Sequence, residues 1–363
     1  MSFPVEPDQL SAAWLTEQLR HAGVVGPQTT VRDFVATSIG DGVGLLGLVV
    51  RVELTYDGPE PGPATVVIKF AHPVAANRAI AMNTRMYERE VTFFRQIASH
   101  VAVPMPRCYA AEVDTDTGRA IVVLEDMRGY RAGDQVEGCD AGEANDIIDA
   151  FVPLHVAFWG DTDRDILATA MRIDGEYIDG FSPAPEGTWR RCLEMFDHCM
   201  TDYVRDGLER YIGSIRELHR VMGGRTQTLV HGDVRLDNVM FGEEEGHDRI
   251  VLVDWQAIMV SNPLQDLAYL VSQNVRTEER RAHEDELLHH YHDRLLERGI
   301  ENYGFDQCVD DYDVAVLYLL SYPIVVAGAF DPANDRGRQL AEAFLGRAVQ
   351  TVTDRDLFAR LPA

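Results

Sequence analysis

The spacing of hydrophobic and polar positions predicts a strand-rich N-terminal part that begins with a helix. Residues 8–22 place Leu10, Trp14, Leu15 and Leu19 at helical spacing, which is typical of an amphipathic helix. A second helical pattern covers residues 77–99. Apolar runs bounded by glycine, proline and aspartate predict strands over residues 31–39, 45–54, 64–70, 108–114 and 119–127.

The remainder of the chain has a mainly helical pattern. Helices are expected over residues 143–159, 188–222, 264–274, 278–298, 309–328 and 335–352. Residues 228–256 are the exception and hold two short strand-like runs. Because 363 residues are too many for one small core, we expect an α+β fold with two domains, residues 1–127 and 128–363. The expected hinge is Leu124–Met127, followed by Arg128 and Gly129.

The composition is that of a globular protein, with 46% hydrophobic and 25% charged residues. The five cysteines form no CxxC pair, and the N-terminus has no basic region followed by an apolar run. We therefore expect reduced thiols and a cytoplasmic protein. The most apolar stretch, residues 314–330, contains Ser321 and Pro323, so a buried helix explains it better than a membrane span.

The net charge of −26 argues against nucleic acid as a partner, because its phosphates would be repelled. A site for a polyanion such as ATP would therefore need a metal ion and locally placed cations. The same charge could attract a cationic acceptor, but it is diffuse along the chain, and solubility is the simpler explanation.

Two motifs in the second half of the chain carry the chemistry of phosphoryl transfer, HGDVRLDN at 231–238 and VLVDW at 251–255. Asp233 can accept or orient the proton of a hydroxyl group, and Arg235 can place a cation near the transferring phosphate. Asn238 and Asp254 offer oxygen ligands to Mg²⁺, and Asp254 follows a strand-like run that would hold it rigidly. Each motif alone could be an ordinary turn or a capped strand end, but their order and spacing favour a kinase site that uses ATP and Mg²⁺.

A single lysine, Lys69, stands inside an apolar strand, whereas the other 32 basic residues are arginines. Strand alternation sets Lys69 on the opposite face from Val66, Ile68 and Phe70. In the following helix Glu90 lies within a hydrophobic stripe, where an acid is costly unless it is paired. We therefore expect a Lys69–Glu90 ion pair that presents the ammonium group to the phosphates of ATP. The alternatives are chance survival of the lysine under a strong arginine bias, and local pairing of Glu90 with an arginine such as Arg89 or Arg95.

The segment GDGVG, with Gly40, Gly42 and Gly44, lies between two predicted strands, 25 residues before Lys69. Glycines allow backbone N–H groups to approach phosphates closely, so a phosphate-binding loop is expected there. A plain hairpin remains the alternative, because such a pattern between strands is common.

Together, HGDVRLDN, DWQ and DLAY resemble the aminoglycoside phosphotransferase and choline kinase-like group, which shares the protein-kinase fold. In form the motifs are most similar to the ecdysteroid-kinase-like branch, and kinase-like domains found with acyl-CoA dehydrogenases are also similar. The resemblance covers roughly residues 31 to 330. It implies a bilobal fold with a β-rich N-lobe, which contains one long helix, and a mainly helical C-lobe.

The resemblance also implies roles for single residues. Lys69 would bind phosphate with Glu90 as its partner, and Glu125 and Met127 would bind adenine through backbone groups. Asp233 would be the catalytic aspartate, Asn238 and Asp254 would hold Mg²⁺, Asp266 would brace the catalytic loop, and His231 would be structural. The same resemblance allows the LHVAFW segment, with His155, Phe158 and Trp159, to line the acceptor pocket, although core packing is the simpler expectation.

The chain departs from the protein-kinase pattern at GDGVGLLG and at DWQ. Only 11 residues separate Asp254 from Asp266, which is too few for the long segment that holds a peptide substrate. We therefore expect a small-molecule hydroxyl acceptor, with neither a protein substrate nor a membrane as partner. Two alternatives stay open, a cationic acceptor of the aminoglycoside or choline type, and a pseudokinase that binds nucleotide without turnover.

Overall fold

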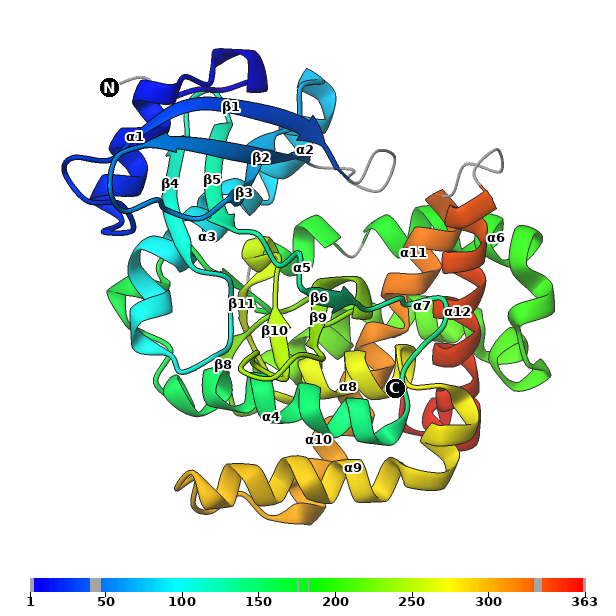
Figure 1. Cartoon of the computed structure of the whole chain (residues 1–363). Coiled ribbons are helices and arrows are strands. Elements are labelled where there is room, and N and C mark those ends of the chain that lie inside the picture. The colour runs from blue at the N-terminus through cyan, green and yellow to red at the C-terminus, as the bar shows by residue number, and fades with distance from the viewer. Residues whose placement is uncertain (1–2, 40–46, 175, 182, 330–334, 362–363) are drawn as a thin grey trace. The chain divides into compact units, whose positions relative to one another are not determined.

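The computed structural model divides the chain into two compact units, each with its own sheet and helices (Figure 1). It describes residues 3–39, 47–174, 176–181, 183–329 and 335–361. The first unit consists of Met1–His100, Pro104–Tyr130 and Val253–Ala257, and the second of Val101–Val103, Arg131–Leu252 and Ile258–Ala363. The short piece around Asp254 therefore belongs to the unit that contains Lys69.

The first unit is built on a five-stranded antiparallel sheet with the order β1-β2-β3-β5-β4. Its strands are β1 (Thr30–Ser38), β2 (Gly47–Asp57), β3 (Thr65–Ala71), β4 (Cys108–Asp114) and β5 (Arg119–Glu125). All five match predicted strands. The alternation of side chains along them gives the sheet two apolar faces, each of which needs a cover.

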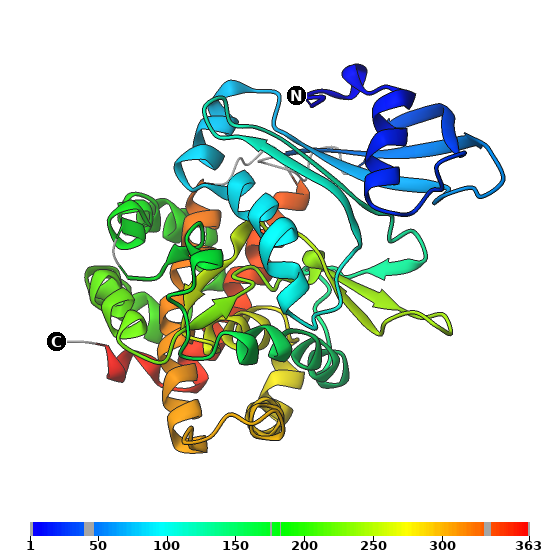
Figure 2. The same ribbon diagram turned by 90° about the vertical axis from the view of Figure 1, so that its left-hand side faces the viewer.

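The first helix covers one face of this sheet (Figure 2). Helix α1 (Ala12–His21) begins at Ser11, whose hydroxyl oxygen accepts a hydrogen bond from the Trp14 N–H group. Its buried Leu15 and Leu19 belong to one core cluster with Ile68 of β3, and Val123 of β5 lies in the same cluster.

A second, shorter helix covers the opposite face of the sheet. Helix α3 (Met86–Thr92) contributes Val91 to a cluster with Val122 and Leu124 of β5. Residue 69 of β3 points to this face, because Ile68 points to the other one. The strand pattern thus directs Lys69 toward the helix that carries Glu90.

The prediction of one long helix over residues 77–99 is wrong in one respect, because the structure has several separate helical pieces there. Helix α2 (Ala75–Asn83) ends before Arg85, which has a left-handed φ of 53° and therefore cannot continue an α-helix. After α3 the chain forms a π-helical turn, Phe93–Ile97, and a 3₁₀ turn, Ala98–His100. The hydrophobic periodicity ran through all of these pieces.

The second unit is mainly helical and contains two small sheets. Its helices are α4 (Ala141–Ala157), α5 (Glu176–Phe181), α6 (Pro183–Phe196), α7 (Asp202–Gly223), α8 (Leu264–Gln273), α9 (Thr277–Glu297), α10 (Phe305–Leu319), α11 (Ser321–Ala329) and α12 (Asp335–Asp354). The single helices predicted over residues 188–222 and 309–328 are each two helices in the structure.

The small sheets have the orders β10-β9-β6 and β7-β11-β8. Their strands are β6 (Tyr130–Ala132), β7 (Met171–Arg172), β8 (Thr228–Val230), β9 (Val239–Gly242), β10 (Ile250–Leu252) and β11 (Met259–Ser261). Three of these fall in residues 228–256, where two were predicted. Strands of three residues carry too little periodicity to be seen in a sequence.

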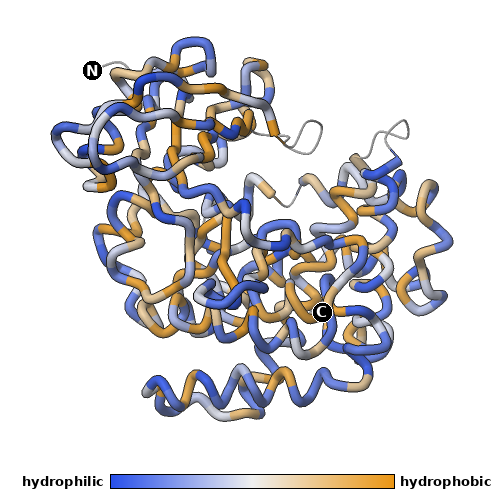
Figure 3. The backbone as a smooth tube through the Cα atoms, viewed as in Figure 1, coloured by the Kyte–Doolittle hydropathy of each residue, from blue (hydrophilic) through white to orange (hydrophobic). Residues whose placement is uncertain are grey.

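The helices of the second unit differ in how deeply they are buried. All ten residues of α8 are buried, whereas hydrophobic and hydrophilic stretches alternate along α9 (Figure 3). The stretch Phe305–Ala329 is long and apolar enough to span a membrane, but 78% of its most apolar window is buried inside the protein. That burial matches the core helices expected from the sequence, which here are α10 and α11.

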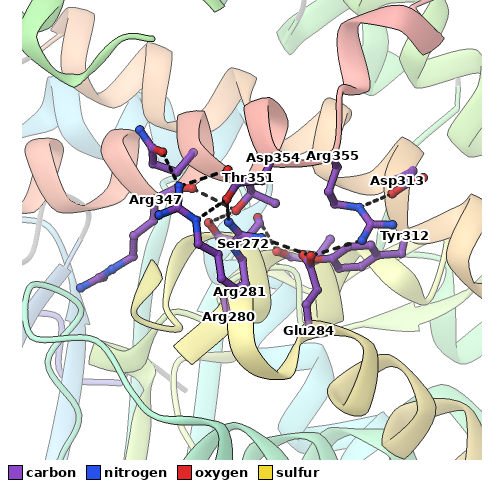
Figure 4. Close-up of polar contacts among 12 residues, drawn as sticks. Ser272, Arg280, Arg281, Glu284, Tyr312, Asp313, Arg347, Thr351, Asp354 and Arg355 are labelled. Carbon is purple, nitrogen blue, oxygen red and sulfur yellow. Dashed lines mark hydrogen bonds and ion pairs between the residues drawn. The ribbon is translucent and has the colours of Figure 1, made fainter. Parts of the chain in front are cut away.

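A network of charged side chains ties α12 to α9 and α10 (Figure 4). Arg280 of α9 donates to Glu284 at 3.1 Å and to Asp354 of α12. Arg355, just after α12, donates to Asp313 at 2.6 Å and to Glu284 at 3.2 Å. Because only 3% of the Arg280 side chain is exposed, its two bonds are shielded from water.

Replacement of Arg280 by methionine is expected to destabilise the protein by about 3 kcal/mol, since it leaves two carboxylates without their shared cation. The matched control is Arg281→Met, which removes a bond of 2.7 Å to the same Asp354. The Arg281 side chain is 48% exposed, so we expect less than about 1 kcal/mol there. Urea unfolding of the two variants measures the difference, and equal midpoints would contradict the assignment.

Candidate active site

Lys69 and Glu90 form the ion pair that the sequence predicted. The Lys69 Nζ atom lies 2.6 Å from Glu90 Oε1 and 3.0 Å from Asp254 Oδ1. Arg95, one of the alternative partners of Glu90, instead has its Nη1 atom 3.6 Å from Glu112 Oε2. The only lysine of the chain is therefore fixed between a carboxylate of α3 and the carboxylate of the VLVDW motif.

These two carboxylates also set the charge of the lysine. Burial by itself would lower the pKa of Lys69, but the negative charges of Asp254 and Glu90 outweigh it and raise the pKa above its usual value. The side chain is 18% exposed. It is a permanent, immobile cation at neutral pH, as a phosphate-binding group must be.

The turn after β10 holds Asp254 in place. Asp254 has a left-handed φ of 66°, and Gln256 donates to its Oδ2 at 3.3 Å. Trp255 is fully buried and stacks on Phe93, with ring centroids 3.8 Å apart and planes 5° from parallel. This stack anchors the DWQ turn to the π-helical turn after α3. Neither the stack nor the direct bond between Asp254 and Lys69 was predicted from the sequence.

The predicted hinge is anchored by an ion pair at its centre. Arg51 donates to both oxygens of Asp126, at 2.7 and 3.1 Å. Burial would raise the pKa of Asp126, but hydrogen bonds from Arg51 and Thr65 outweigh it and lower the pKa. Asp126 lies between the two residues expected to bind adenine, and the pair makes this segment rigid.

Two backbone groups of the expected adenine-binding residues already have partners. The Glu125 N–H group donates to the Arg107 carbonyl oxygen at 2.8 Å, and the Met127 carbonyl oxygen accepts from the Tyr130 N–H group at 3.0 Å. Adenine would therefore have to use other backbone groups of this segment. Gly40, Gly42 and Gly44, the expected phosphate loop, lie outside the described residues.

In the second unit, α8 braces the HGDVRLDN loop that follows β8. The Asp266 carboxylate accepts hydrogen bonds from the N–H groups of His231 at 2.7 Å and Gly232 at 2.9 Å. Gly232 has a φ of 80°, which glycine adopts without strain. His155 lies 3.1 Å from the same carboxylate and is fully buried, so this member of the LHVAFW segment belongs to the core.

Asp233 lies within this loop and is held by two of its neighbours. The Asn238 Nδ2 group donates to Asp233 Oδ2 at 3.0 Å and to the Asp233 carbonyl oxygen at 3.0 Å. Arg235 Nε lies 3.5 Å from the same Oδ2. The Asp233 side chain is 24% exposed. The structure thus brings together Asp233, Arg235 and Asn238 of the predicted set.

Each unit contains one candidate ligand with an oxygen atom of the kind that a hard divalent cation such as Mg²⁺ prefers. Asp254 offers a carboxylate, and Asn238 offers its amide oxygen because its nitrogen is committed to Asp233. Within the described ranges, no group of three or more His, Cys, Asp or Glu side chains could hold a metal ion. One or two protein ligands supplemented by substrate phosphates are typical of Mg²⁺, whereas a closed protein cage is not.

The chain matches one protein family over most of its length. The profile of the ecdysteroid kinase-like family matches residues 42–302. The chain is 25% identical over 194 residues to the probable acyl-CoA dehydrogenase IBR3 of Arabidopsis thaliana, covering 50% of this chain and 22% of that protein. It is 22% identical over 334 residues to the uncharacterized oxidoreductase dhs-27 of Caenorhabditis elegans, and this match covers 82% of this chain and 39% of that protein. It therefore spans less than half the length of these curated relatives.

Solved structures show the same fold. Choline kinase from Cryptosporidium parvum superposes with a TM-score of 0.57 at 9% identity, covering 96% of this chain and 98% of the kinase. The GDP complex of wild-type aminoglycoside 2'-phosphotransferase-IIIa superposes with a TM-score of 0.53 at 14% identity, and the match covers 95% of this chain and 100% of that one. The expected bilobal, kinase-like α+β fold is confirmed.

Proposed function

Because the chain belongs to the ecdysteroid kinase-like family, we propose that it transfers the γ-phosphoryl group of ATP to a hydroxyl group of a small molecule. The observation that carries the proposal is the fixed position of Lys69 between Glu90 and Asp254. Binding of a nucleoside triphosphate requires a lysine that is held by a helix carboxylate and lies beside a metal ligand, and Lys69 has both neighbours. An ordinary structural ion pair would need only one of the two acids.

The residues of the first unit would bind the nucleotide. Lys69 holds the phosphates, Glu90 keeps its ammonium group in place, and the backbone of Glu125–Met127 contacts adenine. Asp254 would be the ligand of Mg²⁺ in this unit, and Asn238 is the candidate ligand that the sequence of the second unit offers. When bound, the ion neutralises charge on the phosphates.

The residues of the HGDVRLDN loop would act on the acceptor. Asp233 accepts the proton of the acceptor hydroxyl as the acceptor oxygen bonds to the γ-phosphorus and the bond to ADP breaks. Arg235, beside Asp233, stabilises negative charge on the transferring group. Asn238 keeps the Asp233 carboxylate in position.

The acceptor would be a small molecule. Between Asp254 and Asp266 the chain forms only a 3₁₀ turn (Trp255–Ala257), strand β11 and the start of α8. This short connection offers no long segment on which a peptide substrate could be held. Two of the structural relatives are, by name, kinases of choline and of aminoglycosides, which are small molecules.

Transfer of the labelled γ-phosphate of ATP tests the proposal, with sterols, amino sugars, cholines and hydroxyacyl compounds as acceptors. We expect a labelled product that requires Mg²⁺, and about 100-fold slower transfer by Asp254→Asn, since a metal ligand contributes several kcal/mol. Asparagine tolerates the left-handed backbone of position 254, so the fold should persist.

The matched control is Asp356→Asn, because Asp356 is also a left-handed aspartate, with a φ of 52°. It should retain wild-type transfer. Nucleotide binding that raises the melting temperature of the wild type, without transfer to any acceptor, would instead identify a binding protein without turnover. Equal transfer rates for wild type and Asp254→Asn would contradict the assignment of Asp254 as a metal ligand.

A further inference from the structure

The segment that follows β6 lies against the end of the HGDVRLDN loop, and we call its residues 133–139 the clamp segment. The Gly133 N–H group donates to the Val239 carbonyl oxygen at 2.9 Å. A Cβ atom at Gly133 would lie 2.3 Å from the Leu236 carbonyl oxygen, so only glycine fits this close approach of two backbones. The clamp segment therefore contacts the loop backbone on both sides of Asn238.

The C-terminal end of α8 joins the same part of the loop to the other end of the clamp segment. The Asn274 Oδ1 atom accepts a hydrogen bond from the Leu236 N–H group at 3.0 Å. The Asn274 carbonyl oxygen accepts one from the Cys139 N–H group, also at 3.0 Å. Asn274 and Cys139 are both fully buried, so these bonds are shielded from water.

Arg347 of α12 holds the clamp segment in place (Figure 4). Its Nη1 atom donates to the Gln135 carbonyl oxygen at 2.5 Å, and its Nη2 atom to the Val136 carbonyl oxygen at 2.9 Å. A longer bond of 3.4 Å joins Nη1 to the Gln273 carbonyl oxygen of α8. A guanidinium group carries five N–H donors in a rigid fork, so it can bind several carbonyl oxygens at once. Arg347 thus connects the clamp segment to two helices of the second unit.

The position of the clamp segment bears on Asp233 through Asn238. The Asn238 amide donates to the Asp233 carboxylate at 3.0 Å and thereby sets its orientation. Asn238 is 4% exposed, and the loop backbone is held by the clamp segment before and after it. Misplacement of a catalytic group by about 1 Å can slow a reaction about 100-fold, so a displaced loop backbone would reduce the rate.

We propose that Arg347 is a positioning residue of the phosphoryl-transfer site, which holds the clamp segment against the loop and thereby fixes Asn238 and Asp233. This inference rests on the proposed function of Asp233. Loss of Arg347 would lower kcat, because the Asp233 carboxylate would no longer be held in one orientation. It would leave the KM for ATP unchanged, because Lys69 and the other proposed nucleotide-binding residues belong to the first unit.

The first test compares Arg347→Met with Arg205→Met. Arg205 of α7 donates to the Asp197 carboxylate at 2.8 Å and to the Met200 carbonyl oxygen at 3.5 Å. Both variants lose hydrogen bonds that connect a helix to another segment, so both should lower the midpoint of urea unfolding. We expect kcat to fall about 10-fold in Arg347→Met alone, with the KM for ATP unchanged. Equal kcat values for the two variants would overturn the inference.

The second test, Gly133→Ala, displaces the loop and leaves Arg347 intact, so it decides the matter alone if Arg347→Met does not fold. The added methyl group would meet the Leu236 carbonyl oxygen, and kcat should fall about 10- to 100-fold. Its control is Gly346→Ala in α12, where a Cβ atom would meet nothing within 4 Å and the rate should not change. Equal rates for these two alanine variants would contradict the role of the clamp segment.

The double variant shows whether both changes act through the clamp segment. Arg347→Met combined with Gly133→Ala should lower kcat by less than the product of the two single effects, because a released segment can move away from the loop. A loss equal to the full product would mean that the two residues act independently, and Arg347 would then not position the loop through this segment.

If the wild type transfers phosphate to no acceptor, the proposed function has failed, and hydrogen exchange of the amide groups of residues 236–239 decides the role of Arg347. Faster exchange in Arg347→Met than in Arg205→Met would still support the link from α12 to the loop. Equal exchange in the two variants would overturn it.

Discussion

Replacement of Asp233 by asparagine is expected to slow phosphoryl transfer about 10³- to 10⁴-fold, at the upper end of the contribution of a proton acceptor. An amide has nearly the same shape as the carboxylate, and its oxygen can still accept from Asn238, which lies 3.0 Å away. It cannot take the proton of the acceptor hydroxyl. Initial rates of transfer at saturating ATP measure the loss, and nucleotide affinity should be preserved because the ATP ligands are unchanged.

Asp237 is the matched control for this variant. It lies in the same loop, and its Oδ1 atom accepts a hydrogen bond from the Gln135 N–H group at 3.2 Å. Asp237→Asn removes the same charge and keeps an oxygen acceptor, so we expect transfer close to the wild-type rate. If both variants lost activity equally, the loop would depend on its overall charge, and the assignment of Asp233 as proton acceptor would be wrong.

Replacement of Lys69 by arginine is the second large effect that we expect, a loss of about 10²- to 10³-fold in transfer. The ammonium group fits between Glu90 and Asp254 at 2.6 and 3.0 Å, in a position where 18% of the side chain is exposed. A guanidinium group keeps the charge, but it is longer and planar and spreads that charge over three nitrogens. It would displace Asp254 or withdraw from the phosphates.

The reverse exchange on the same sheet is the control. Arg32 of β1 lies 3.3 Å from Asp57, and both side chains are about 60% exposed. Arg32→Lys should leave transfer and stability unchanged, since exposed ion pairs contribute little. Rates are compared at several ATP concentrations. Near-normal transfer by Lys69→Arg would show that any cation suffices at this position, and it would contradict the specific phosphate-binding role assigned to Lys69.

The parts of the site that the sequence predicted depend on local periodicity. The position of Lys69 on one face of β3 follows from strand alternation, and that of Glu90 in a hydrophobic stripe follows from helical spacing. Each pattern is a property of a few neighbouring residues. The ion pair could therefore be predicted once α3 was assumed to cover that face of the sheet.

The errors of prediction arose where distant contacts set the local backbone. The helix expected over residues 77–99 is broken at Arg85 by a left-handed residue, although the hydrophobic spacing continues through it. The π-helical turn that follows carries Phe93, which stacks on Trp255. Those two rings are 162 residues apart in sequence, and no local pattern could have joined them.

The sequence by itself determined the family motifs, the order of most elements and the residue types able to bind phosphate, metal and a hydroxyl proton. Motif residues are recognisable because their chemistry admits few substitutes. Only the tertiary structure decided that Lys69 also bonds Asp254, and that Glu125 and Met127 already use backbone groups. The physical reason is that these contacts depend on how helices and strands pack in three dimensions, which spacing along the chain does not encode.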